Sequence, residues 1–231
     1  MRVRVGFTPG EPVGAPVGIV IDVLRATSTI CQALASGYER VICVGEIDDA
    51  RALAGEGVAL AGERHNVRIE GFDHGNSPRE FVAGVAARST LVLTTTNGTR
   101  LLLAAAARCE TVLVASLLNL SAVVEAALGA SEVAVLCAGV EGDFAIDDAY
   151  VAGRVAEALG GRPDDAAIAA IRLAQTFPSA EEGIAGGSSA ANIRHAGLDD
   201  DIPWCARESV LDLVPRVVER AESAVVLAAS S

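Results

Sequence analysis

Short apolar runs alternate with polar turns along most of the chain. The runs predict strands at 17–21, 41–44, 58–61, 91–94, 112–115 and 133–136. Most turns lead into Ala- and Leu-rich stretches that predict helices near 27–36, 46–54, 98–107, 119–128, 146–159 and 164–176. Apolar strands that alternate with helices are typical of an α/β fold whose mainly parallel sheet is covered on both faces.

The chain is long and apolar enough to bury a substantial core. It has 231 residues, of which 51% are hydrophobic, and its mean hydropathy is +0.40. This size fits a single domain, or two closely joined lobes with a boundary near residue 160. The part beyond 161 is harder to assign, with a Gly/Ser-rich stretch at 183–189 and an apolar end at 210–229.

Polar residues follow the apolar runs at the positions where an α/β sheet binds ligands. In such sheets ligands lie outside the carboxyl ends of the strands. The segments at those ends read DVLRATS (22–28), GER (62–64), TTTNGTR (94–100), SLLN (116–119) and CAGVEGDF (137–144). Each carries charge, hydroxyl groups or glycine. The connection at 62–78 also contains GFDHGNSP, too rich in Gly, Asp and Asn for a plain linker.

The segment TTTNGTR has two interpretations. Asn-Gly is a common tight-turn dipeptide, so the segment is in the simplest view a strand end and a turn. A helix-forming stretch, 101–107, follows it directly. A strand-turn-helix junction gathers hydroxyls and free backbone N–H groups at a positive helix end, where anions bind.

Several acidic residues near these turns have the chemistry of a Mg²⁺ site. Asp22 stands at the tip of a buried strand, which favours a catalytic or metal-binding role over a simple helix cap. Mg²⁺ prefers carboxylate oxygens and water, and Glu63, Asp73, Asp147 and Asp148 are further candidates. Asp147 and Asp148 also suit the first turn of a helix. Neighbouring helical residues point about 100° apart, so we expect one of the two to face solvent.

The charge balance limits the partners of the protein. The net charge of −12 argues against a nucleic-acid partner, although a small anionic substrate fits if cations gather locally. All 18 basic residues are Arg, which excludes a Schiff-base lysine and the P-loop lysine. A phosphate or carboxylate clamp must therefore use arginine. Arg in the polar turns occurs at Arg25, Arg64, Arg79 and Arg100.

Other site chemistries find little support. The five cysteines include no C-x-x-C pair, the three histidines are too scattered for a zinc triad, and there is no G-x-S-x-G motif. Cys137 ends a strand, but Asp143 stands where a cysteine phosphatase needs Arg, so we expect a pocket-lining thiol. Neither a stretch of about 20 apolar residues nor a signal peptide is evident, and we expect a soluble cytoplasmic protein.

Six segments together resemble the 2-phosphosulfolactate phosphatase family. They are IDVLRATSTI (21–30), GER (62–64), GFDHGNSP (71–78), TTTNGTR (94–100), CAGVEGDF (137–144) with Asp148 beyond it, and DIPWC (201–205). They occur in the family's order over nearly the whole chain. Two positions depart from its pattern. Residues 188–192 read Ser-Ser-Ala-Ala-Asn where a Ser-x-His-Gly-like pattern is common, and Asp147 stands where Glu is usual.

The resemblance implies a three-layer α/β/α fold and an Mg²⁺-dependent phosphatase. Its implied reaction converts 2-phospho-3-sulfolactate to 3-sulfolactate and phosphate, a step of coenzyme M biosynthesis in methanogens. Activity on related 2-phospho-hydroxy acids is a second expectation. A catalytically silent anion-binding protein on the same scaffold is a third. The oligomeric state stays open, with a homodimer among the alternatives.

The candidate residues combine the turn segments with the resemblance. The expected catalytic residues are Asp22, Arg25 and Asp148, and Asp22 either attacks phosphorus or aligns a water molecule. The expected Mg²⁺ ligands are drawn from Asp22, Glu63, Asp147 and Asp148. The expected substrate-binding residues are Ser28, Arg64, Asn76, Ser77, Thr95, Thr96, Asn97, Gly98, Thr99, Arg100, Cys137 and Gly139.

Overall fold

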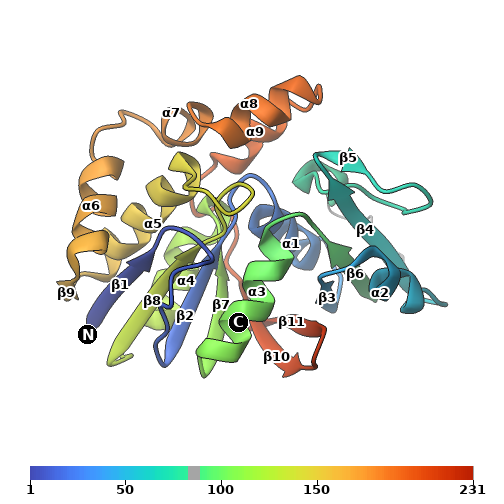
Figure 1. Ribbon diagram of the computed structural model, residues 1–231, viewed down its shortest axis with the longest axis horizontal. Coiled ribbons are helices and arrows are strands. Elements are labelled where there is room, and N and C mark those ends of the chain that lie inside the picture. Colours follow the sequence, from blue (N-terminus) through green and yellow to red (C-terminus); the bar gives the residue numbers. More distant parts are fainter. Residues whose placement is uncertain (83–88, 231) are drawn as a thin grey trace.

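One mixed sheet organises the protein, seen here in a computed structural model that describes residues 1–82 and 89–230 (Figure 1). Its eleven strands within these residues run in the order β5-β4-β6-β3-β11-β10-β7-β2-β8-β1-β9. Their bounds are β1 Arg2–Gly6, β2 Val17–Ile21, β3 Arg40–Val44, β4 Val58–Arg64, β5 Val67–Arg68, β6 Thr90–Thr94, β7 Thr111–Ala115, β8 Glu132–Cys137, β9 Arg162–Pro163, β10 Val214–Arg220 and β11 Ala224–Ser230.

Nine α-helices accompany the sheet in the described part of the chain. They are α1 Ala26–Ala35, α2 Ile47–Ala52, α3 Gly98–Arg108, α4 Leu120–Ala127, α5 Ile146–Leu159, α6 Asp165–Ala174, α7 Ala180–Ala185, α8 Ser188–His195 and α9 Asp201–Cys205. Two short 3₁₀ helices, η1 Pro78–Glu80 and η2 Leu117–Asn119, occupy connections. The predicted α/β fold with a mainly parallel sheet is confirmed. All six predicted strands and all six predicted helices are present, with ends shifted by at most three residues.

An antiparallel hairpin joins two parallel parts of the sheet. On one side β2 pairs in parallel with β7 and β8, and β8 pairs with β1. On the other side β6 pairs in parallel with β3 and β4. The hairpin of β10 and β11 lies between them, antiparallel to β7 and to β3. This hairpin was not assigned from the sequence, because one long apolar stretch does not reveal where a turn divides it.

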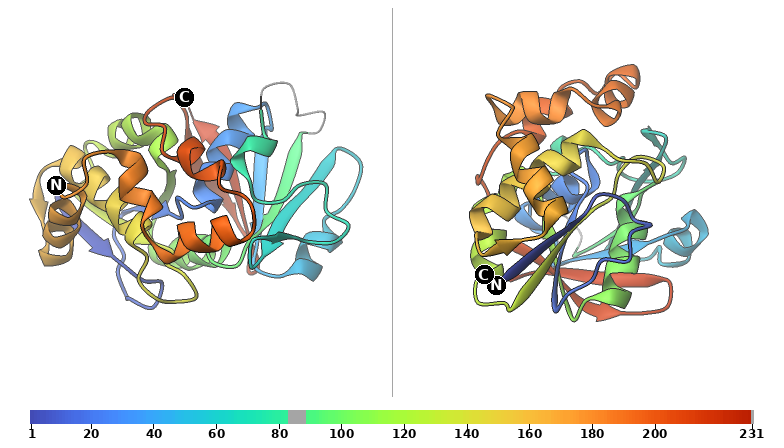
Figure 2. Two further views of the ribbon diagram at one scale, coloured as in Figure 1. Left: turned by 90° about the horizontal axis from the view of Figure 1, so that it is seen from above. Right: turned by 60° about the vertical axis from the view of Figure 1, so that its left-hand side comes forward.

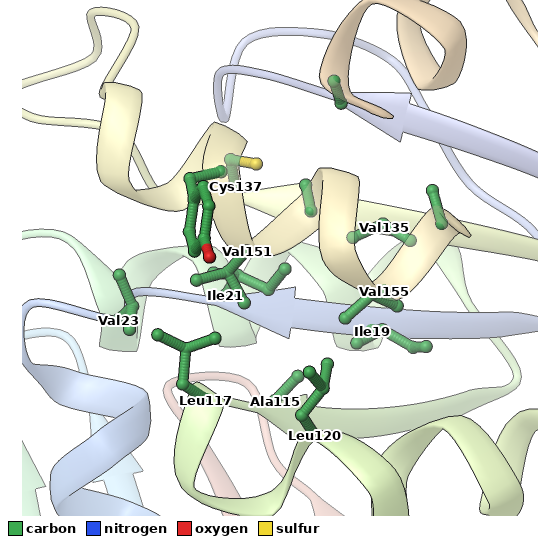
Figure 3. Packing of buried hydrophobic residues seen from close by; sticks show 14 of the residues in the cluster. Ile19, Ile21, Val23, Ala115, Leu117, Leu120, Val135, Cys137, Val151 and Val155 are labelled. Carbon is green, nitrogen blue, oxygen red and sulfur yellow. The ribbon is translucent and has the colours of Figure 1, made fainter. Parts of the chain in front are cut away.

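Both faces of the sheet are buried. Ile19 and Ile21 of β2 pack into a core cluster with α4, α5 and α6, whereas Val20 packs on the opposite face in a cluster with α1 and α3. Figure 3 shows the first cluster, where Ile19 and Ile21 meet Val151 and Val155 of α5. Successive strand residues point to opposite faces, so an all-apolar strand such as β2 needs cover on both sides.

The chain beyond residue 160 returns to the rest of the molecule at several places. Helix α6 packs against α5 and β1, and β10 and β11 enter the middle of the sheet. Helices α7, α8 and α9 lie together at the top of the view in Figure 1, and Figure 2 shows them from above. This places α8 and α9 over the end of the sheet at which β2 stops.

Candidate active site

A polar cavity of about 400 Å³ opens at the carboxyl ends of β2, β4 and β6. Helix α8 and the loop between β8 and α5 complete its wall. A smaller hollow of about 50 Å³ shares part of this lining and reaches the start of α5. The larger cavity is lined by Asp22, Leu24, Arg25, Glu63, His65, Asn66, Val67, Asn76, Thr95, Thr96, Asn97, Val140, Glu141, Asn192, His195 and Ala196.

Asp22 lies at the shared wall of the two hollows, directly after β2. Its Oδ1 accepts a hydrogen bond of 3.2 Å from the backbone N–H of Ala26, at the start of α1. Burial raises its pKa to about 7, and the charges of Asp147 and Glu63 act in the same direction. A carboxyl group with this pKa changes its protonation state near neutral pH, as general acids and bases do.

Gly98 lets the start of α3 approach Asp22 closely. A Cβ atom at this position would lie 2.6 Å from Asp22 Oδ2 and 2.6 Å from the Cβ of Ala26. Any larger residue would therefore displace the carboxylate or the helix. Gly98 therefore leaves space for the Asp22 carboxylate because it has no side chain.

Two further carboxylates stand on the first turn of α5. Asp148 accepts backbone hydrogen bonds from Val23, at 2.9 Å, and from Gly139, at 3.0 Å, and so ties the ends of β2 and β8 together. Burial first, and then the charges of Asp147 and Asp22, raises the pKa of Asp148. Burial also raises the pKa of Asp147 to about 6.

The expectation that one of these two aspartates faces solvent is wrong. Asp147 is 1% exposed and Asp148 2%. The first turn of α5 is covered on a second side by α8, whose Ser189 donates a hydrogen bond of 2.9 Å to Asp147 Oδ1. Both carboxylates line the smaller hollow.

Glu63, at the end of β4, holds the turn after β6. Its Oε1 accepts hydrogen bonds from the backbone N–H of Thr96, at 2.9 Å, and from the Thr96 hydroxyl, at 3.0 Å. Its Oε2 accepts from the backbone N–H of Asn66 at 2.7 Å. Glu63 thus fixes two segments of the cavity wall while its side chain lines the cavity.

The turn TTTNGTR leads into α3 and presents Thr95, Thr96 and Asn97 to the cavity. Thr95 and Thr99 bond reciprocally: the backbone N–H of each donates to the hydroxyl of the other at 3.2 Å. Asn97 Oδ1 accepts from the backbone N–H of Glu141 at 3.2 Å. The threonine hydroxyls therefore stabilise the strand-turn-helix junction itself. The backbone of the turn forms part of the cavity wall.

Of the four arginines in the polar turns, Arg25 lines the cavity, and Arg64, Arg79 and Arg100 do not. Arg25 lines it and is 2% exposed. Arg64 turns its guanidinium to the backbone oxygens of Glu63, at 2.8 Å, and Gly45, at 3.0 Å. Arg100 is exposed and pairs with Glu46 at 3.3 Å. Among the described residues, Arg25 is thus the arginine that brings positive charge to the cavity.

The remaining predicted binding residues occupy three kinds of position. Asn76 lines the larger cavity and Gly139 the smaller hollow. Ser28 and Ser77 are buried and bond within the protein, Ser28 to the backbone oxygen of Val23 at 2.8 Å. Cys137 lies among the apolar side chains of the core, as Figure 3 shows, and burial raises its pKa well above the ordinary value.

Several cavity residues were not among the sequence candidates. Asn192 and His195 come from α8, which the sequence pattern left unassigned just after the Gly/Ser-rich stretch at 183–189. They are three residues apart and so share a helix face. Asn66, His65 and Glu141 lie in loops, and only the folded sheet brings them together. The segments around Glu141, His65 and Asn66 were expected at the strand ends, but nothing in the sequence showed that these particular side chains line the cavity.

The fold and cavity define an α/β protein with a carboxylate-rich site at the carboxyl ends of its strands. The family model for 2-phosphosulpholactate phosphatase matches residues 8–220. The chain therefore belongs to the 2-phosphosulpholactate phosphatase family, as its motifs indicated.

Relatives from bacteria and an archaeon are similar over almost their full length. The chain is 40% identical over 219 residues to a probable 2-phosphosulfolactate phosphatase of Thermotoga maritima, covering 94% of this chain and 95% of the relative. It is 39% identical over 222 residues to one of Thermus thermophilus, with 93% and 94% covered. It is 38% identical over 216 residues to the 2-phosphosulfolactate phosphatase of Methanothermobacter thermautotrophicus, with 93% and 92% covered.

Proposed function

We propose that this protein is a phosphoric monoester hydrolase that converts 2-phospho-3-sulfolactate to 3-sulfolactate and phosphate. The observation that carries the proposal is the polar cavity, in which Asp22, with its pKa near neutrality, lies in the same wall as Arg25. Family membership and the names of the relatives support the substrate.

The charges around the cavity favour a cation in the working site. Asp22, Glu63 and Glu141 line the cavity with carboxylates, against the single guanidinium of Arg25 among its described lining residues. A substrate that bears phosphate, carboxylate and sulfonate groups would meet repulsion there. Neutralisation by a bound cation therefore favours binding of such an ester.

We propose Mg²⁺ as this cation, held by Asp22 with Asp147 or Glu63. Asp22 lines the larger cavity with Glu63 and the smaller hollow with Asp147, so it lies between the other two carboxylates. Among the described residues no three His, Cys, Asp or Glu side chains are grouped closely enough to hold a metal by themselves. The donors instead fit the usual Mg²⁺ site of one or two carboxylates, completed by water and substrate oxygens. A bound Mg²⁺ would polarise the phosphoryl group.

The protein groups have separate tasks in the proposed reaction. Arg25 binds the phosphoryl oxygens and stabilises the charge that develops on them. Asp22 acts at the phosphorus, either as the nucleophile or by accepting a proton from an aligned water molecule. Asp148, fixed by two backbone N–H groups, holds the ends of β2 and β8 in place around Asp22. Thr95 and Asn97, in the turn after β6, bind the remaining anionic groups of the substrate. The N–H and the hydroxyl of Thr96 instead bond to Glu63 and hold this turn in place.

The reducing interior of a cell suits the cysteines of this protein. All five are free and buried, as is common for proteins of the cytoplasm. No helix in the described residues is long and apolar enough to cross a membrane. We propose a cytoplasmic location on this ground.

Phosphate release from a panel of esters tests the function. The panel contains 2-phospho-3-sulfolactate, phospholactate and phosphoglycolate, each with Mg²⁺ and with EDTA. We expect the highest kcat/KM for the sulfonated ester, and a loss of activity with EDTA that added Mg²⁺ restores. A higher kcat/KM for another ester would correct the substrate. No turnover of any ester, together with saturable anion binding, would show a silent binding protein instead.

The two alternatives for Asp22 are separated by trapping an intermediate in a single turnover with excess enzyme. If Asp22 is the nucleophile, an acid quench should preserve the aspartyl-phosphate, and mass spectrometry should detect the added phosphoryl group on the peptide that contains Asp22. If water attacks the ester directly, no phosphorylated peptide should form at any time point. The variant Asp22→Asn serves as the control and should carry no phosphoryl group.

A further inference from the structure

Asp201 is a buried acidic residue that has no task in the proposed reaction. It begins α9, a position where an acidic side chain usually points to solvent and favours the helix dipole. Its neighbour Asp200 is exposed and pairs with Arg79 at 3.1 Å. Asp201 instead is 0% exposed. Its side chain therefore bonds to groups inside the protein.

Each oxygen of Asp201 accepts a hydrogen bond from a different part of the chain. Oδ2 accepts from Nη1 of Arg25 at 2.7 Å, and Oδ1 accepts from the Ser77 hydroxyl at 2.6 Å. These partners are 176 and 124 residues away in the sequence. One carboxylate thus joins α9, the residue before α1 and the residue before η1.

Stability is a weak explanation for this buried ion pair. Removing two charges from water costs about as much as their attraction returns, and apolar replacements of such pairs are often as stable. The side chains of Arg25 and Asp201 are 2% and 0% exposed, so both charges are almost completely removed from water. The geometry that the pair imposes on Arg25 is the better explanation, since Arg25 lines the cavity.

The contacts of Arg25 leave Nε and one of the two hydrogens of Nη2 for another partner. Nη2 donates to Asn66 Oδ1 at 3.1 Å, and buried Nε has no hydrogen-bond partner among the described residues. The edge formed by Nε and Nη2 can bind two oxygens of one anionic group side by side.

We infer that Asp201 is a positioning residue, which holds Nη1 of Arg25 so that the Nε–Nη2 edge is presented to an oxyanion of the substrate. The identity of that oxyanion as part of a phosphate ester rests on the proposed function. Ser77 holds the second oxygen of Asp201 and keeps the carboxylate from rotating. The segment DIPWC, which begins with Asp201, thereby gains a role at the site without lining the cavity.

A double-mutant cycle tests this inference. We expect Asp201→Asn to lower kcat/KM at least about tenfold when Arg25 is present, and less than about twofold in the Arg25→Ala background, because residues that act through one another are not additive. Asp200→Asn, a change of the exposed neighbour, should leave kcat/KM as in the wild type. An equal loss in both backgrounds, or no loss at all, would overturn the inference.

Binding of inorganic phosphate, followed by calorimetry, repeats the cycle without turnover. Asp201→Asn should weaken phosphate binding when Arg25 is present and leave it unchanged in the Arg25→Ala background. If the wild type hydrolyses no ester while this pattern holds, the proposed function fails and the positioning role stands. Absence of phosphate binding by the wild type would overturn the role itself.

A milder variant covers the case in which Asp201→Asn does not fold. Ser77→Ala removes the hydroxyl donor to Oδ1 and leaves the ion pair with Arg25 in place. We expect a smaller loss of phosphate affinity than for Asp201→Asn, again present only with Arg25. Unchanged affinity in Ser77→Ala would contradict the role of Asp201 as a fixed anchor.

Discussion

The buried carboxylate of Asp22 should make the protein less stable as the pH rises toward neutrality. Its pKa in the fold is about 7, against 3.8 for the unperturbed group. Between these values the folded state retains a proton that the unfolded state has lost, so the free energy of unfolding falls as pH increases. The destabilisation is complete above the folded pKa and absent below the unfolded one.

The size of the effect follows from the difference between the two values. About three pKa units at roughly 1.4 kcal/mol each give an upper limit of about 4 kcal/mol at about pH 8. Asp22→Asn replaces the charged group with a neutral one of similar shape and removes this cost. For a chain of this length we expect the melting temperature to rise by several degrees, since about 1 kcal/mol corresponds to roughly 2–4 °C. The same variant should lose more than about tenfold in kcat, equivalent to about 1.4 kcal/mol of barrier.

Thermal unfolding between about pH 5.5 and pH 8, in EDTA, measures this prediction. The wild type should lose stability across the range, and Asp22→Asn should show a shallower slope. Asp48→Asn is the matched control, because Asp48 is exposed and pairs with Arg51 only at 3.4 Å on the surface. Equal slopes in wild type and Asp22→Asn, or a lower melting temperature of Asp22→Asn at about pH 8, would refute the reasoning.

Three further predictions concern other parts of the structure. Gly98→Ala should lower kcat/KM at least about tenfold by displacing Asp22, whereas Gly10→Ala, in open space, should not change it. Arg100→Ala should leave kcat/KM within about twofold and the unfolding free energy within about 0.5 kcal/mol, because its ion pair is exposed; a larger loss would place this arginine at the substrate. The native protein should resist alkylation by iodoacetamide near neutral pH, because all five cysteines are buried and burial raises the pKa of Cys31 to about 12. After denaturation, mass spectrometry should count five added groups. Rapid labelling of the native protein would contradict the burial of the cysteines.

The sequence pattern predicted the six strands that read as short, separate apolar runs, and missed the alternating strand β1 and the hairpin of β10 and β11. Strand β2 reads VGIVI and is identified by its continuous run. Strand β1 reads RVRVG, with Arg at alternate positions, and pairs along its length only with β8. Arg2 and Arg4 lie near Glu132, at 3.8 and 3.7 Å, which gives these polar positions partners at the sheet surface. A short alternating strand near a sheet edge carries too little hydrophobic signal to stand out.

The sequence pointed to site residues that directly follow a strand. It did not point to residues whose place at the site depends on the direction of a long side chain. Asp22, Glu63 and the turn after β6, all at strand ends, line one cavity. The strand ends gave no information on the direction of a long side chain, so Arg64 and Arg25 looked equivalent in sequence. In the structure one bonds to Gly45 and the other lines the cavity. The rotamer and the partner of an arginine are set by tertiary neighbours that local sequence does not encode.

The position of the β10–β11 hairpin has a consequence for how the protein folds. The cavity draws Asp22 from one parallel part of the sheet and Glu63 from the other, and the hairpin lies between these parts. No residue that lines the cavity, as the structure describes it, belongs to the hairpin. During synthesis the ribosome makes both parts well before the strands that connect them. A nascent chain can therefore pair the strands within each part before Ala224–Ser230 is available, whereas the sheet becomes continuous only when the hairpin has paired, and such distant pairing slows folding.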